Sequence, residues 1–111
     1  MKKTVYIASA YTQGDTAINV KAQLDIANQL MDFGFAPYTP LLSHFQHMAH
    51  PRKYQDWIEL DNVWVLKCDM VLRLKGISPG ADKKCELAKK HGITVYYNIA
   101  ELIYTESERA M

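Results

Sequence analysis

The stretch "MVLRLKGISPGADKKCELAKKHGITVYY", residues 70–97, contains a complete strand–helix–strand unit and decides the fold. It begins with the apolar run 70–74 and ends with the β-branched and aromatic run 93–97, and both have the length of buried strands. A loop with Gly and Pro lies between them and leads into an expected helix at about 81–91. Two strands joined through a helix run parallel, because the helix returns the chain to the end of the sheet where the first strand began.

The same alternation occurs upstream. The run 4–8 has the character of a strand, and a helix is expected over 17–33, with Gly34 as its stop. The expected apolar stripe of this helix consists of Val20, Leu24, Ala27, Leu30 and Met31. A short strand at 35–38 contains Pro37, which predicts a position at or near a sheet edge.

The remaining segments complete the pattern. Residues 39–54 are expected to form a long irregular loop, of the kind that often acts as a lid or binding loop. Helices are expected at 54–68 and, capped by Asn98, at 99–104. We therefore expect one domain over residues 1–111, a small Rossmann-like or flavodoxin-like three-layer α/β sandwich with a four- to five-stranded parallel sheet.

Composition excludes several classes of function. A net charge of +1 argues against a nucleic-acid-binding protein. The apolar runs fall far short of a membrane span, and the one after the N-terminal lysines is too short for a signal sequence. Cys68 and Cys85 form no CxxC motif, which favours reduced thiols in the cytoplasm. A core this small favours a homodimer or a higher homo-oligomer, which would cover leftover apolar surface.

Three polar loops follow strands and should meet at the carboxyl edge of the sheet, where such folds bind ligands. The expected ligand-contacting residues are Ser9, Tyr11, Gly14, Asp15, His44, Ser78 and Gly80. Asp15 is equally well explained as a helix N-cap, and Ser78 can serve as a cap, a ligand contact or both. His44 could bind a base or donate a proton to a leaving group. The three loops together predict a small-molecule site.

No metal or cofactor is expected. His47 and His50 stand three residues apart, but no Cys or acid completes a ligand set with them. We interpret both as solvated loop residues.

Asp61 is the most informative single residue. It falls within the apolar arc of helix 54–68, which consists of Trp57, Leu60, Trp64, Val65 and Cys68. An ionised carboxylate among such side chains is costly unless something pairs with it. Ligand hydroxyls at the sheet edge would do so. Backbone amides or an arginine would do so equally in a purely structural role.

The third helix holds two candidates for a reactive group. Its buried arc is expected to contain Ala81, Cys85, Leu87 and Ala88. Lys84 lies on that side, one turn before Ala88, whereas Glu86 lies on the opposite, solvated side with Lys90. Helical phase therefore predicts that Lys84 faces the site and that Glu86 faces water.

Three segments together carry a resemblance to a known family. "YIASAY" (6–11), "DNVWVLKCD" (61–69) and "GISPGADKKCELAKKHG" (76–92) are similar to the nucleoside 2-deoxyribosyltransferase-like superfamily. The short phage- and bacteria-associated branch of that superfamily looks most similar, and the likeness covers roughly residues 4–103. It implies a Rossmann-like fold that cleaves or transfers the N-glycosidic bond of a (deoxy)nucleoside or nucleotide.

The resemblance also implies roles for residues. Asp61 would orient the ribose, and Ser78 and Gly80 would cradle a phosphate or hydroxymethyl group. Ser9 and Tyr11 would supply contacts from the first loop. A glutamate early in the third helix would attack the anomeric carbon and form a glycosyl-enzyme. Members of the superfamily are commonly dimers or larger assemblies.

The nucleophile position departs from the family pattern. Four residues after Gly80 stands Lys84, where the pattern has glutamate, and Glu86 would match only if the helix began two residues later. A lysine forms no glycosyl ester, although a desolvated lysine can act as a nucleophile or base. Three hypotheses follow: an enzyme in which Asp61, with Glu86 or Lys84, does the chemistry; a catalytically inactive protein that binds or sequesters a nucleotide; or a protein-interaction module that has only kept the fold. The motifs favour ligand binding over the third.

Overall fold

The structure, a computed structural model, describes residues 1–110. Its strands are β1 (Thr4–Ala8), β2 (Ala36–Tyr38), β3 (Met70–Arg73) and β4 (Thr94–Tyr96). Its helices are α1 (Thr16–Asp32), the 3₁₀ turn η1 (Pro40–Leu42), α2 (Ser43–Ala49), α3 (Tyr54–Lys67), α4 (Pro79–Lys90) and α5 (Ile99–Ala110). All four predicted strands are present.

The strands form one parallel sheet in the order β2-β1-β3-β4, which confirms the predicted Rossmann-like or flavodoxin-like class with four strands. Val5 pairs with Pro37 on one side and with Met70 on the other, so β1 is central. β2 lies at an edge, where Pro37 removes no hydrogen bond that the sheet needs. The strand order reverses between β1 and β3, the point at which such sheets open a crevice for ligands.

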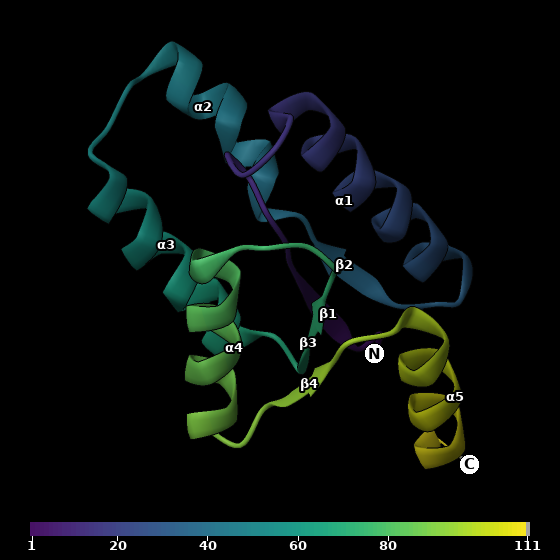
Figure 1. Cartoon of the computed structure of the whole chain (residues 1–111). Coiled ribbons are helices and arrows are strands. Elements are labelled where there is room, and N and C mark those ends of the chain that lie inside the picture. Colours follow the sequence, from purple (N-terminus) through teal and green to yellow (C-terminus); the bar gives the residue numbers. More distant parts are fainter. Residues whose placement is uncertain (111) are drawn as a thin grey trace.

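Helices cover both faces of the sheet (Figure 1). On one face Val5 and Ile7 of β1 pack with residues of α1 and α5. On the other face Tyr6 and Ala8 pack with residues of α3 and α4. This alternation follows from the two-residue period of a strand, and it gives the domain two apolar cores.

Two predicted boundaries differ from the structure. Residues 39–54 are not irregular, since η1 and α2 occupy most of the segment. α2 buries none of its side chains, so it has no apolar stripe that a sequence pattern could show. The last helix extends to Ala110 rather than to residue 104, because Leu102 and Glu106, one turn apart, are both buried.

The stripe predicted for α1 is displaced. Leu24 and Met31 are 40% and 59% exposed, whereas Gln23, Ala27 and Leu30 are buried. In α3 the predicted arc is only partly buried, because Leu60 and Trp64 keep 38% and 39% of their surface exposed. Gln23 explains why the stripe of α1 was misplaced. It is buried although it is polar, and a hydrophobicity pattern assigns such a residue to the surface.

Two further features concern helix hydrophobicity and the cysteines. Across residues 1–110, none of the helices has the length and apolar character needed to cross a membrane. Cys68 and Cys85 are buried and free, as the sequence predicts.

Candidate functional site

A cavity of about 540 Å³ lies at the carboxyl ends of the strands. It is bounded by the loop after β1, by η1 and α2, by the first half of α3 and by the start of α4. Figure 1 shows these elements gathered at one end of the sheet, with α2 beyond the strand ends. The crevice at the β1/β3 reversal is therefore a formed cavity, large enough for a small organic ligand.

Asp61 and Lys84 meet at the floor of this cavity. Lys84 Nζ lies 3.6 Å from Asp61 Oδ2, and the two side chains are 11% and 16% exposed respectively. Burial raises the pKa of Asp61, and the nearby Lys84 partly counteracts that rise. Among the described residues that line the cavity, Asp61 is the one carboxylate. Helical phase thus placed both residues correctly, and the partner of Asp61 is a lysine rather than an arginine or backbone amides.

Tyr6 is a further polar residue beside the cavity, and it was not among the expected site residues. Its side chain is fully buried in β1, yet it borders the cavity. Its ring stacks on Tyr38 at 5.7 Å, and Tyr38 stacks on Trp64 at 5.2 Å. Within residues 1–110 the Tyr6 hydroxyl has no hydrogen-bond partner. A tyrosine in an apolar strand gives no sequence signal that its hydroxyl is left without a partner.

The loop before α4 supplies backbone donors. The Ser78 hydroxyl accepts a hydrogen bond from the Ala81 N–H at 3.1 Å, so Ser78 is the N-cap of α4, and it also lines the cavity. The Ser78 carbonyl accepts from the Asp82 N–H. The Gly80 N–H, in the first turn of the helix, has no intrahelical acceptor. A Cβ at Gly80 would lie 3.7 Å from the Tyr54 hydroxyl, an ordinary contact.

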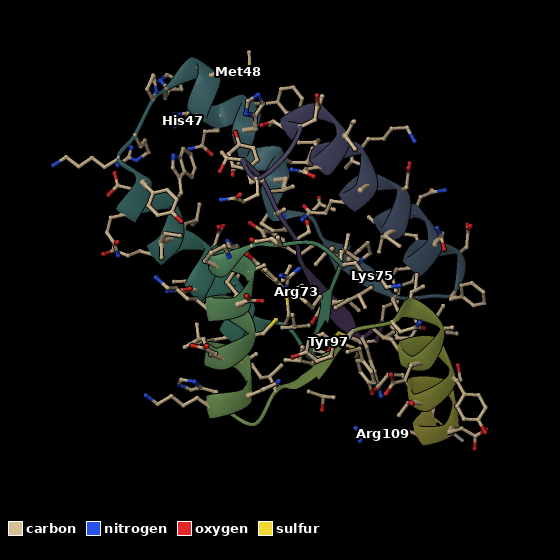
Figure 2. All side chains as sticks on the ribbon, viewed as in Figure 1. His47, Met48, Arg73, Lys75, Tyr97 and Arg109 are labelled. Atoms are coloured by element: carbon tan, nitrogen blue, oxygen red, sulfur yellow. The ribbon has the colours of Figure 1, made fainter. Side chains whose placement is uncertain are left out.

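Arg73 fixes the position of that loop (Figure 2). It is buried at the end of β3 and donates hydrogen bonds to the carbonyls of Leu74 and Gly76 and to Asp82 Oδ1. The bond from Arg73 Nη2 to Asp82 measures 3.0 Å. Arg73 thus ties the strand end, the loop and the first turn of α4 together. In the sequence, the one sign of this role is a single Arg within the apolar run 70–74.

Gln23 plays the corresponding part for the loop after β1. Its Nε2 donates to the Ile7 carbonyl at 3.1 Å and to Ser9 Oγ at 2.9 Å, while its Oε1 accepts from the Leu41 N–H at 3.0 Å. Asn19 donates to the carbonyl of Tyr11 within the same loop. One buried amide side chain therefore joins β1, the first loop and η1.

Two aromatic–histidine pairs lie beside the cavity, and His44 itself does not line it. Tyr11 and His44 are hydrogen-bonded through the phenol and Nδ1, and Tyr11 lines the cavity. The Trp57 Nε1–H donates to His47 Nδ1 at 2.9 Å, which joins α3 to α2. The interpretation of His47 as a solvated loop residue is therefore wrong: it lies on α2 and lines the cavity (Figure 2).

The other expected residues lie away from the cavity. Asp15 is exposed and is the N-cap of α1, accepting from the Ile18 N–H at 2.9 Å. Gly14, with φ of +85°, is exposed in the same loop. Glu86 is exposed, as helical phase predicts, and His50 is the exposed C-cap of α2. Of the expected set, Ser9, Tyr11, Asp61, Ser78, Gly80 and Lys84 line the cavity.

Residues 3–98 match a family described as a domain of unknown function, DUF7768. The chain belongs to the DUF7768 family. The match covers the whole sheet and every residue that lines the cavity. No curated protein matches the chain.

Proposed function

We propose that this DUF7768 protein binds a nucleoside or nucleotide, and most specifically a nucleoside 5′-monophosphate, in the cavity at the β1/β3 reversal. The observation that carries the proposal is the largely buried Asp61–Lys84 pair in the cavity, with Lys84 Nζ 3.6 Å from Asp61 Oδ2. A paired acid and base that border a cavity offer an acceptor for sugar hydroxyls and a cation for a phosphate.

The surroundings suit the three parts of such a ligand. The Gly80 amide at the start of α4 and the Lys84 ammonium supply donors for a phosphate. Tyr54, Trp57 and Ile58 give an apolar wall against which a flat base can pack. Arg52, beside them and 54% exposed, adds positive charge at the mouth.

A catalytic function is the second candidate, and the raised pKa of Asp61 favours it. A carboxyl group whose pKa is raised by burial inside a cavity is a common feature of catalytic acids. Cleavage or transfer at the N-glycosidic bond is the reaction that the resemblance of the sequence implies. In this protein that reaction would depend on Asp61 and Lys84, since Glu86 lies on the exposed face of α4.

Binding is tested by calorimetric titration of the protein with the four ribonucleoside and four deoxyribonucleoside 5′-monophosphates and the free nucleosides. At least one monophosphate should bind the wild type, and Lys84→Met should bind it at least tenfold more weakly, because a charged hydrogen bond is lost. Glu86→Gln is the matched control on the same helix and should bind like the wild type. Equal affinity of Lys84→Met and the wild type would contradict the proposal.

Catalysis is tested on the same ligands by chromatographic detection of released base. Release by the wild type that is lost in Asp61→Asn supports the enzyme. Absence of release by the wild type, together with release gained in Lys84→Glu, supports a binder that lacks the nucleophile. Loss of release in Glu86→Gln would show that the exposed face of α4 takes part.

We further propose that the protein is a cytoplasmic homodimer or higher homo-oligomer. Two buried free thiols fit a reducing compartment. Val63, Trp64 and Leu66 leave 49%, 39% and 42% of their surfaces exposed on α3, which suits burial against a second copy. Light scattering after size-exclusion chromatography should give a mass of at least twice 12.7 kDa.

A further inference from the structure

One nitrogen atom of His47 joins α2 to the opposite wall of the cavity. His47 Nδ1 accepts a hydrogen bond from the Trp57 Nε1–H at 2.9 Å and another from the backbone N–H of Arg52 at 3.3 Å. Trp57 belongs to α3, and Arg52 belongs to residues 50–53, which link α2 to α3. Three consecutive segments of the chain therefore meet at a single acceptor, and both His47 and Trp57 line the cavity.

These two donors determine the protonation state of His47. An indole N–H can only donate a hydrogen bond, and so can a backbone N–H, so Nδ1 accepts through its lone pair. The imidazole is therefore neutral, with its proton on Nε2. A protonated imidazole is a donor at both nitrogens and accepts from neither Trp57 nor Arg52. The connection between α2 and α3 thus exists only while His47 is neutral.

Hydrogen bonds rather than packing hold α2 in place. The helix buries none of its side chains, and Phe45 and Met48 keep 61% and 67% of their surfaces exposed. Figure 2 shows Met48 pointing away from the rest of the domain. A helix that buries little apolar surface gains little free energy from docking, so the loss of one hydrogen bond has a large effect on its position.

The carboxylates of α3 do not offer a protonated His47 a new partner. Asp56 Oδ2 lies 3.2 Å from Arg52 Nε, and Asp61 is paired with Lys84 across the cavity. Glu59 is exposed and does not line the cavity. The positive charge that protonation adds to His47 is therefore not compensated from α3.

The other titratable or charged groups around His47 do not favour that charge either. Those on α2, on the link, at the start of α3 and on the loop after β1 are His44, His50, Lys53, Tyr54 and Tyr11. Lys53 and any protonated histidine among them repel a further positive charge. The bond between His44 and Tyr11 survives protonation, because a protonated His44 can donate to the phenol oxygen. The first turn of α2 thus stays tied to the first loop when the bond to Trp57 is lost.

We propose that α2 is a lid on the cavity, held closed by the neutral form of His47 and released when His47 is protonated. Histidine changes its charge between about pH 5 and pH 8, so the lid is closed at the upper end of this range and opens toward the lower end. On release the second half of α2 moves away from α3, while His44 holds the first turn. The switch controls access to the cavity and does not depend on which ligand the cavity takes.

The first measurement follows the hydrogen bond by NMR of the ¹⁵N-labelled protein without ligand. The chain has two tryptophans, so Trp57→Phe identifies the indole N–H signal of Trp57. That signal should shift upfield as the pH falls from about 8 to about 5, because the bond to His47 is lost. The shift should be absent in His47→Gln, whose side-chain oxygen accepts from the indole at any pH.

His50→Gln is the matched control for this measurement. His50 is the exposed C-cap of the same helix and carries no bond to Trp57, so its replacement should leave the pH response of the Trp57 signal unchanged. A Trp57 signal that does not respond to pH in the wild type would overturn the proposal. A response of equal size in His47→Gln would overturn it as well.

The second measurement follows the position of α2 with spin labels at Met48→Cys and Glu59→Cys. Both positions are exposed, and the native cysteines are buried and stay unlabelled. The distribution of distances between the labels should be narrow at about pH 8 and should gain a longer component at about pH 5. Adding Trp57→Phe should produce the longer component already at about pH 8. A distribution that changes neither with pH nor with Trp57→Phe would show that the bond does not hold α2 closed.

Discussion

Lys84 Nζ lies 3.6 Å from Asp61 Oδ2, and each side chain keeps less than a fifth of its surface in water, at 11% and 16%. The distance is longer than a good hydrogen bond, so both groups keep hydrogen-bonding capacity for a ligand. A desolvated pair of this kind contributes little to stability, because the cost of removing two charges from water offsets their attraction. We therefore interpret the pair as part of the site.

Replacing both charges should leave the fold intact. We expect the free energy of unfolding of Asp61→Asn/Lys84→Met to lie within about 1 kcal/mol of the wild type, whereas Lys84→Met alone should lose about 1–3 kcal/mol by leaving Asp61 unpaired. Urea denaturation measures both. Lys21→Met/Asp25→Asn removes an exposed pair and should be nearly neutral. A double variant less stable than either single variant would show that the pair is structural.

Gly80→Ala should separate stability from binding. The added methyl group meets only the Tyr54 hydroxyl at 3.7 Å, and Gly80 has no positive φ, so stability should be unchanged or higher by up to about 1 kcal/mol. Ligand affinity should fall, because the methyl group keeps a phosphate away from the backbone.

Gly34→Ala is the control for that experiment. Gly34 has φ of +88°, so alanine there should cost about 1 kcal/mol or more while leaving affinity unchanged. Thermal melts and titrations of both variants give the comparison. Gly80→Ala with unaltered affinity would place the ligand elsewhere.

Gln23→Leu should destabilise the protein by about 1–3 kcal/mol, because it removes the buried hydrogen bond to the Ile7 carbonyl and leaves the partly buried Leu41 N–H without a partner. It should also weaken ligand binding, since Gln23 holds the first loop through Ser9. Gln29→Leu, at an exposed position of the same helix, should change neither the stability nor the ligand affinity. Chemical denaturation of the two variants measures the difference, and equal stabilities would refute the role given to Gln23.

Glu106 should make stability depend on pH in the acid range. Burial acts to raise its pKa, but hydrogen bonds from Lys3 and Tyr96 prevail and lower it below its ordinary 4.5. Because the folded-state pKa is the lower one, its stabilising contribution is complete above about pH 4.5 and is lost as the pH falls through the folded-state pKa.

Unfolding curves measured from pH 7 to pH 3 should show this loss in the wild type. Glu106→Gln should be less stable at pH 7 by about 1–3 kcal/mol and should lose less on acidification. Equal acid dependence in the two proteins would mean that Glu106 is not the group responsible.

The sheet and most helices could be predicted because strands such as 70–73 are short continuous apolar runs separated by loops with Gly. α2 could not, because a helix with no buried side chain leaves no periodic pattern. The stripe of α1 was misplaced for the opposite reason, since Gln23 is buried but polar.

Two kinds of signal predicted residues that line the cavity. Ser9, Tyr11, Ser78 and Gly80 stand in loops that follow strands, and Asp61 and Lys84 are charged residues whose helical phase is apolar. Asp61 and Lys84 stood on apolar sides of their helices, which the pattern reveals. Tyr6 and Arg73 lie in strands, and their roles depend on what other segments bring beside them. That information is in the three-dimensional arrangement and not in the local sequence.

The most direct test of the account is the affinity of the wild type and of Lys84→Met for nucleoside 5′-monophosphates, measured by calorimetry beside Glu86→Gln. We expect saturable binding of at least one monophosphate by the wild type and by Glu86→Gln, and affinity at least tenfold weaker in Lys84→Met. No binding of any monophosphate or nucleoside by the wild type, or equal binding by all three proteins, would contradict the account.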